Sequence, residues 1–232
     1  MPTSEPRTIV VTGATRGLGR ALTERFLENG HRVLACGRSA EHVLELSALA
    51  PDDQVFARSV DVTSDAVVAA WAVEARARGL VPDLVVANAA RINDPAPLWE
   101  VSAEEFDGVL AVNVSGIANV VRAFVPAMIE RGRGVVACLS SGWGRFGAAD
   151  VGPYCASKFA VEGFVSSLSH DLPSGLAAVA VGPGVVGTDM LRQVRGTGVT
   201  GHETPEPWSR RAAPFFLHLS AADNGASLSV PS

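Results

Sequence analysis

The segment TIVVTGATRGLG, residues 8–19, decides the fold of this 232-residue chain. Its first five residues form a short β-branched run, typical of a strand buried on both faces of a parallel sheet. Three glycines follow at the spacing G-x-x-x-G-x-G, and a helical pattern then runs from about Arg16 to Asn29 and stops at Gly30. Such a turn lets backbone N–H groups approach a pyrophosphate. The segment therefore predicts dinucleotide binding, with a plain strand-to-helix turn as the weaker alternative.

Apolar runs of strand length alternate with helical patterns along the rest of the chain. Further strands are expected at residues 32–36, 55–60, 83–87, 134–139, 177–181 and 226–230. Ser39 and Ser102 are expected to cap helices, the second of which reaches about Arg131, and another helix spans residues 152–172. The alternation predicts an α/β fold with one domain over residues 1–232, a single doubly wound parallel sheet of the Rossmann type with helices on both faces.

Residues 189–211 are the one stretch without a clear period. The stretch contains three glycines, Gly196, Gly198 and Gly201, and ends near two prolines. An irregular segment of this length inside a compact domain is usually functional or mobile. We therefore expect a mobile substrate loop that orders when ligands bind.

Composition excludes several classes of protein. With 47% hydrophobic and 19% charged residues the chain is not disordered, and its net charge of −5 does not suggest nucleic-acid binding. No apolar run approaches the ~18 residues that span a bilayer, and residues 1–7 lack the apolar core of a signal peptide. The three cysteines have no C-x-x-C spacing and the five histidines are scattered, so no disulfide scaffold or metal site is expected. These features predict a cytoplasmic protein with no membrane partner.

The only tyrosine and the only lysine of the chain, Tyr154 and Lys158, lie four residues apart. All other basic residues are arginines, apart from the histidines. The spacing places both side chains on one face of the helix expected at residues 152–172. An ammonium has been kept where a guanidinium would differ in shape, hydration and basicity. The pair therefore indicates a functional site, and drift in a GC-rich genome is the alternative explanation.

Together with the glycine turn, this pair gives the chain a resemblance to the short-chain dehydrogenase/reductase family that covers almost its whole length. Residues 12–19 match the family's T-G-x-x-x-G-x-G, residues 154–158 match Y-x-x-x-K, and residues 183–188 match the P-G-x-x-x-T loop over the nicotinamide. The remaining matches are Asp61-Val62, Asn88-Ala89-Ala90, Asn113 and Ser141, which lies thirteen residues before Tyr154. Seven such matches in this order are far more specific than any one of them.

The resemblance implies four catalytic residues: Asn113, Ser141, Tyr154 and Lys158. Tyr154 would exchange a proton with the substrate oxygen as hydride moves between nicotinamide and carbon. A free phenol has a pKa of about 10, and a nearby cation lowers it by roughly 1–3 units. Lys158 would supply that cation and hold the nicotinamide ribose. Ser141 would hydrogen-bond the substrate oxygen, and Asn113 would anchor a water in a proton relay.

The end of the second strand favours NADP(H) over NAD(H). An NAD enzyme usually places an acid there, whereas this chain has Gly37-Arg38-Ser39. Arg38 and Arg16 are two cations suited to a 2′-phosphate. Ala90 replaces the usual family glycine, and its methyl group would crowd the cofactor or stiffen the turn. The cofactor-binding residues implied by the resemblance are Gly13, Thr15, Arg16, Gly17, Leu18, Gly19, Arg38, Asp61, Val62, Asn88, Ala89, Ala90, Tyr154, Lys158, Pro183, Gly184, Val186 and Thr188.

Residues after the fourth, fifth and sixth strands predict the substrate class, because doubly wound folds bind ligands beyond the carboxyl ends of their strands. The expected apolar walls are Trp99, Trp143, Phe146, Met190, Leu191 and Trp208. The few charges are Arg91, Arg145 and Arg192. This balance favours an uncharged, fairly bulky ketone or aldehyde as the small-molecule substrate. Arg145, close to Ser141 in the sequence, leaves a carboxylate substrate open.

Two alternatives to an NADP(H)-dependent carbonyl reductase or alcohol dehydrogenase remain. One is a non-catalytic NADP(H)-sensing or scaffold protein of the same fold, which has no need of a proton relay. The other is a dehydratase or epimerase of the same family. A homotetramer or homodimer is also expected, because residues 106–129 contain only two charges, Asp107 and Arg122. Relatives pair this helix and the next across a dimer interface.

Overall fold

The computed structural model describes residues 5–195 and 201–232. All of its strands belong to one seven-stranded sheet in the order β3-β2-β1-β4-β5-β6-β7, and every neighbouring pair is parallel. The strands are β1 (Thr8–Thr12), β2 (Arg32–Gly37), β3 (Val55–Ser59), β4 (Leu84–Ala87), β5 (Gly134–Leu139), β6 (Leu176–Gly182) and β7 (Ser227–Ser229). The order reverses between β1 and β4, and ligands bind such sheets beyond the carboxyl ends of the strands at that point. The predicted fold class is confirmed.

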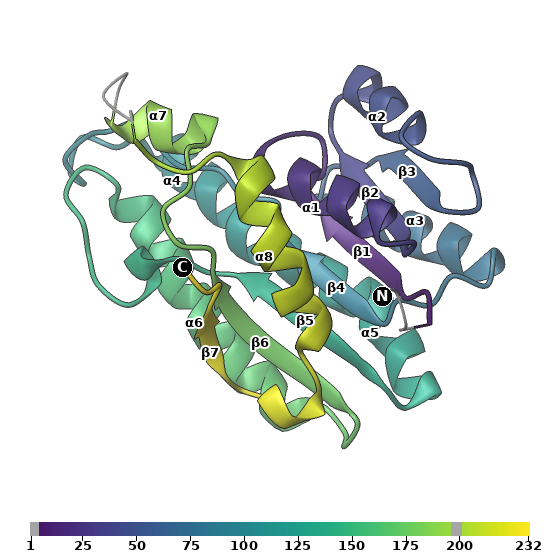
Figure 1. Ribbon diagram of the computed structural model, residues 1–232. Helices are drawn as coiled ribbons and strands as arrows, with labels where there is room; N and C mark the ends of the chain where they lie inside the picture. Colours follow the sequence, from purple (N-terminus) through teal and green to yellow (C-terminus); the bar gives the residue numbers. More distant parts are fainter. Residues whose placement is uncertain (1–4, 196–200) are drawn as a thin grey trace.

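Helices cover both faces of the sheet (Figure 1). One face packs against α1 (Gly17–Glu28), α2 (Ala40–Ser47) and α8 (Pro205–His218). The other packs against α3 (Asp65–Ala77), α5 (Gly116–Arg131) and α6 (Gly152–Asp171). Each face of the sheet has its own hydrophobic core, and alternate strand residues point into one or the other. Ile9 and Val11 point into the first core and Val10 into the second. This is why the strands are apolar throughout rather than alternating.

The long helix expected at residues 102–131 is interrupted. Ser102 caps α4 (Ala103–Leu110) by accepting a hydrogen bond from the Glu105 N–H. A π turn, Ala111–Ser115, then separates α4 from α5. Such wide turns inside helices frequently occur at functional sites, and this one carries Asn113.

Residues 189–195 and 201–211 are more regular than the sequence suggests. They contain α7 (Asp189–Arg195) and the first turns of α8, so the expectation of an irregular loop is wrong for these parts. The Thr188 hydroxyl accepts a hydrogen bond from the Leu191 N–H at 3.3 Å, and Pro205 opens α8 at a position that proline favours. Gly196 and Gly198 lie outside the described residues, and the mobility of the segment stays a prediction.

The stretch Ala103–Arg131 is long and apolar enough, by length and composition alone, to cross a membrane. The expectation that no stretch approaches this length is therefore wrong, because small residues between the larger ones keep the whole segment apolar. Ile117, Val120 and Phe124 of this stretch are buried against the sheet, as in the core helix of a globular domain. The stretch thus supplies one of the two hydrophobic cores.

Candidate active site

Tyr154 and Lys158 occupy the first two turns of α6, at the carboxyl end of β5. Both side chains are buried, with exposed fractions of 7% and 2%. The Lys158 Nζ donates a hydrogen bond to the Leu139 carbonyl oxygen at 2.6 Å and lies 5.4 Å from the centre of the Tyr154 ring. The i, i+4 spacing therefore brings the two groups together, but the ammonium faces the ring and the end of β5.

Burial shifts the pKa values of both groups. It raises the pKa of Tyr154 to about 12, where the Ser141 hydroxyl acts to lower it and Cys155 to raise it further. It lowers the pKa of Lys158 to about 8, against the effect of Cys138. The shift of the Tyr154 pKa is opposite in direction to the one expected from the sequence, because desolvation outweighs the hydrogen bond with Ser141. Tyr154 is consequently protonated at neutral pH.

Ser141 and Trp143 lie on the loop after β5, next to Tyr154. Ser141 caps a short 3₁₀ turn, Gly142–Gly144, and its Oγ accepts a hydrogen bond from the Trp143 N–H at 3.2 Å. The Trp143 ring packs edge-to-face on the Tyr154 ring, with centroids 6.0 Å apart and an interplanar angle of 87°. A hydroxyl, a phenol and an indole therefore meet at one place.

Asn113 is fully buried and links the loop after β4 to α6. Its Oδ1 accepts a hydrogen bond from the Arg91 N–H at 2.8 Å, and its Nδ2 donates to the Arg91 carbonyl and to Ser157 Oγ, both at 2.9 Å. Ser157 Oγ in turn donates to the Tyr154 carbonyl at 2.7 Å. Sequence reasoning missed Ser157, although its place one residue before Lys158 on a buried helix was a usable signal.

The glycine turn forms a cradle that side chains would fill. Gly13 and Gly17 have φ angles of +63° and +57°, which favour glycine. A Cβ atom on Gly19 would lie 2.2 Å from the Gly13 carbonyl oxygen. The N-cap residue Arg16 makes no side-chain cap at the start of α1 in the described structure, so N–H groups there remain for a ligand. The cradle fits a pyrophosphate.

Hydrogen bonds between Asn88 and Thr12 support this cradle. The Thr12 Oγ1 accepts hydrogen bonds from the N–H groups of Asn88 and Ala89, both at 3.0 Å. The Asn88 Nδ2 donates to the carbonyl oxygens of Thr12 and Gly13 at 2.8 and 3.1 Å. The Asn88 side chain therefore shapes the turn, and the partly buried Ala90 follows directly on the same segment.

The two arginines expected at the adenosine end are both exposed. The turn that carries Arg16 reaches the end of β2, because a Cβ atom on Gly37 would lie 2.4 Å from Thr15 Cγ2. Burial acts to raise the pKa of Asp61, but hydrogen bonds from Thr63 and the charge of Arg38 lower it overall. Asp61, which precedes the buried Val62, therefore carries a negative charge near the Arg38 guanidinium.

The segment after β6 returns to the glycine turn. Gly184 has a φ of +81°, and a Cβ atom on Gly17 would lie 3.8 Å from Thr188 Cγ2. The Trp208 Nε1 donates to the Pro183 carbonyl at 2.9 Å, and this indole is fully buried in the core. Trp208 therefore anchors α8 against this segment. The expectation that Trp208 lines the substrate pocket is wrong.

The other expected wall residues differ in how they are buried. Trp143 and Met190 pack with Val151 and Tyr154 in a small apolar cluster at the site. Trp99 and Phe146 are 86% and 60% exposed. Leu191 is partly buried at the N-terminal end of α7. Tyr154 belongs both to this apolar cluster and to the catalytic site.

The three arginines that could have bound an anionic substrate make contacts within the protein instead. The Arg145 Nε lies 3.4 Å from Glu162, and its Nη2 donates to Ser227 Oγ at 2.8 Å. Arg192 pairs with Asp189 of its own helix, and the Arg91 guanidinium lies against Gly108. Arg145 is thus engaged with α6 and β7, which removes the reason for expecting a carboxylate there.

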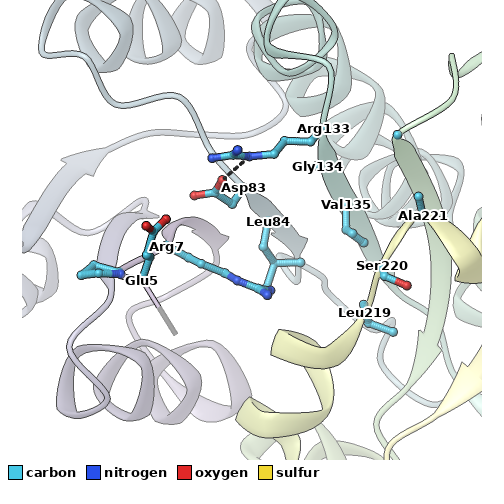
Figure 2. Close-up of a pocket in the computed structure, with 12 residues that line it drawn as sticks. Glu5, Arg7, Asp83, Leu84, Arg133, Gly134, Val135, Leu219, Ser220 and Ala221 are labelled. Carbon is cyan, nitrogen blue, oxygen red and sulfur yellow. Dashed lines mark ion pairs between the residues drawn. The ribbon is translucent and has the colours of Figure 1, made fainter. Parts of the chain in front are cut away.

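A cavity of about 430 Å³ opens at the opposite end of the sheet, where the central strands β1, β4 and β5 begin (Figure 2). Arg7, Asp83 and Arg133 line it, and Arg133 lies 3.7 Å from Asp83 in an ion pair. None of the expected cofactor or catalytic residues lines this cavity. Among the described residues, no cluster of three or more His, Cys, Asp or Glu side chains could hold a metal ion.

Comparison with known proteins identifies the family. Residues 7–197 match the model of the short chain dehydrogenase family. An NADPH-dependent pterin aldehyde reductase from Arabidopsis thaliana is 43% identical over 225 residues, covering 97% of this chain and 93% of that protein. An NADP-dependent 3-hydroxy acid dehydrogenase from Escherichia coli is 31% identical, covering 83% of this chain and 78% of its own.

Solved structures agree. The closed form of serine dehydrogenase complexed with NADP⁺ has a TM-score of 0.86 at 29% identity and covers 97% of this chain and 94% of its own. A gluconate 5-dehydrogenase from Burkholderia cenocepacia with NADP and tartrate has a TM-score of 0.87 at 25% identity, with coverages of 99% and 95%. The chain belongs to the short-chain dehydrogenase/reductase family. It is therefore an oxidoreductase of carbonyl and alcohol groups, and these relatives bear out the prediction of NADP(H).

Proposed function

We propose that this enzyme uses NADPH to reduce an uncharged, fairly bulky aldehyde or ketone. The observation that carries the proposal is the meeting of the Ser141 hydroxyl, the Tyr154 phenol and the Trp143 indole beside the buried Lys158. The site lies at the carboxyl ends of the strands, in the region of the glycine cradle. Trp143 and Met190 give it apolar walls.

The proton chemistry follows from the two shifted pKa values. A nicotinamide bound at this site would supply the hydride that reduces the carbonyl carbon. Ser141 donates a hydrogen bond to the carbonyl oxygen, and Tyr154, protonated because burial raises its pKa to about 12, donates the proton. Lys158, with its pKa lowered to about 8, exchanges a proton near neutral pH and returns one to Tyr154. A lysine with an ordinary pKa would stay charged throughout.

Asn113 fixes the position of the π turn on which it lies. Its Oδ1 and both hydrogens of its Nδ2 are engaged with Arg91 and Ser157. The relay water expected near Lys158 is therefore held by main-chain atoms of the turn, which a π turn frees from the regular helical ladder. The side chain fixes that turn against α6.

The cofactor residues have distinct tasks. Gly13, Thr15, Gly17, Leu18 and Gly19 hold the pyrophosphate on the N-terminus of α1. Arg16 and Arg38 bind the 2′-phosphate, and Asp61 and Val62 contact adenine. Asn88, Ala89 and Ala90 keep the cradle open, Lys158 binds the nicotinamide ribose, and the ring of Tyr154 contacts the cofactor. Pro183, Gly184, Val186 and Thr188 cover the nicotinamide.

A planar aromatic aldehyde is the substrate class that this site fits best. The indole of Trp143 stands beside the proton donor, where it offers an aromatic surface to the substrate. The Arabidopsis relative is named for a pterin aldehyde, a flat bicyclic substrate. Arg145 is the one cation of the loop between β5 and α6, residues 140–151, and its side chain is turned to Glu162 and Ser227. No anionic group is therefore required of the substrate.

A substrate panel tests this function. NADPH absorbance is followed with a pterin aldehyde, an aliphatic aldehyde of similar size and a short 3-oxo acid. We expect the highest kcat/KM with the aromatic aldehyde and the lowest with the acid. A preference for the acid would overturn the substrate class. Binding of NADPH without turnover would support a sensor or scaffold, and product formed without net cofactor change would indicate a dehydratase or epimerase.

The lowered pKa of Lys158 predicts a pH dependence. The group must be protonated to supply a proton, so kcat for carbonyl reduction should be constant well below pH 8 and fall as the pH rises through about 8. Lys158→Arg should be severely impaired and should show no such fall, because a guanidinium keeps its proton. Stopped-flow rates across the pH range provide the check. A wild-type profile that stays flat well above pH 8 would contradict the relay.

We also propose a cytoplasmic homotetramer, or otherwise a homodimer. Ile129 of α5 and Phe159 of α6 are 43% and 48% exposed, and an assembly through these helices would cover them. Light scattering at micromolar concentration measures the assembly, and a monomer would refute the proposal.

A further inference from the structure

The loop that carries Ser141 is fastened to α6 by the carboxylate of Glu162. This residue lies one helical turn beyond Lys158 and two beyond Tyr154, on the same side of α6. Its Oε1 accepts a hydrogen bond at 2.5 Å from the Oγ of Ser140, which is only 2% exposed and directly precedes Ser141. The carboxylate thus reaches the residue next to the proposed substrate-binding hydroxyl.

Arg145 and Ser227 complete the network around this carboxylate. The Glu162 Oε2 accepts a hydrogen bond from Ser227 Oγ at 2.7 Å, and the Arg145 Nε lies 3.4 Å from Oε1. Arg145 also donates to the carbonyl of Leu228 at 3.2 Å. One side chain of α6 therefore joins Ser140 and Arg145 of this loop to the edge strand β7.

The loop backbone also touches α6 directly. A Cβ atom on Gly144 would lie 2.8 Å from the carbonyl oxygen of Lys158 and 2.9 Å from Ser140 Oγ. The loop backbone therefore approaches α6 closely at Gly144, and hydrogen bonds at Glu162 hold it there. Without the carboxylate, the buried Ser140 hydroxyl would lose its acceptor, and the loop would be free to shift.

We propose that Glu162 is a positioning residue of the reduction. Through Ser140 and Arg145 it holds Ser141 at the separation from the Tyr154 phenol that a substrate carbonyl requires. The inference rests on the proposed role of Ser141 as a hydrogen-bond donor to the substrate oxygen. Displacing a reacting group by about 1 Å costs up to about 100-fold in rate, so a small shift of the loop is sufficient to lower kcat.

The first test replaces the carboxylate. Glu162→Ala should lower kcat by about 10- to 100-fold and leave the Kd for NADPH unchanged, because the proposed phosphate and adenine contacts lie elsewhere. Glu162→Gln keeps an acceptor oxygen for Ser140 and should recover most of kcat. Glu130→Ala is the matched control, since it removes a carboxylate that is ion-paired with Arg76 outside this network. Wild-type kcat in Glu162→Ala would overturn the inference.

The second test is a double-mutant cycle with Ser141→Ala. If Glu162 acts through Ser141, Glu162→Ala should change kcat by less than about twofold in the Ser141→Ala background. Equal losses in both backgrounds would overturn the inference alone. Wild-type kcat in Ser141→Ala itself would overturn the proposed function of Ser141 and the inference with it. Should Glu162→Ala not fold, Ser140→Ala removes only the hydroxyl and carries the same cycle.

Discussion

Tyr154→Phe is expected to bind NADPH as tightly as the wild-type enzyme and to lose about 1,000-fold in kcat, within the range that a general acid contributes. The substitution removes the hydroxyl and keeps the ring, so the edge-to-face contact with Trp143 survives. The phenol is 7% exposed, and no water replaces its proton at the same geometry. Single-turnover kinetics with saturating NADPH measure the loss.

The control for this variant lies in its cofactor affinity and its thermal melting curve. Both should match the wild type, because the hydroxyl accounts for neither the core packing of the ring nor the proposed phosphate contacts. A near-normal kcat in Tyr154→Phe would rule out the phenol as proton donor. A loss of NADPH binding would instead give the hydroxyl a role in holding the cofactor.

Arg38→Asp is expected to weaken NADPH binding by about 10- to 100-fold, the equivalent of one charge-assisted hydrogen bond. A carboxylate at this position repels the 2′-phosphate and accepts a hydrogen bond from the 2′-hydroxyl of NADH, so NADH use should improve. The ratio of kcat/KM for the two cofactors is the measurement.

A matched charge reversal controls for the change in net charge. Arg210→Asp changes an exposed arginine on α8 that pairs with Glu206, and it should leave the cofactor preference unchanged. If the wild-type enzyme already prefers NADH, the interpretation of Arg16 and Arg38 is wrong.

Much of the fold could be predicted because local sequence and tertiary structure agree. Residues 8–12 are β-branched and apolar, and they form a strand buried on both faces as β1. Ser39 accepts a hydrogen bond from the His42 N–H at the start of α2, as a capping serine should. The π turn at Asn113 could not be predicted, because one wide turn barely changes the hydrophobic period of a long helix.

For the candidate site, too, the sequence predicted some features and not others. The i, i+4 spacing of Tyr154 and Lys158 predicted their proximity, since a helix fixes that geometry. The sign of the Tyr154 pKa shift depends on how deeply the phenol is buried, which no spacing reveals. The orientation of Arg145 depends on Glu162 and on β7, which begins 82 residues later. Local sequence patterns do not predict long-range contacts of this kind.

The sole tyrosine offers a direct test of the acid–base account. Protein labelled with carbon-enriched tyrosine gives one phenol resonance, whose shift with pH reports the ionisation of Tyr154. Without cofactor the account predicts a protonated phenol at about pH 10, where an ordinary tyrosine is half ionised. With NADP⁺ the positive nicotinamide should lower the pKa by roughly 1–3 units, so the phenol should ionise at lower pH. The same titration in both states would contradict the claim that Tyr154 faces the reacting end of the cofactor.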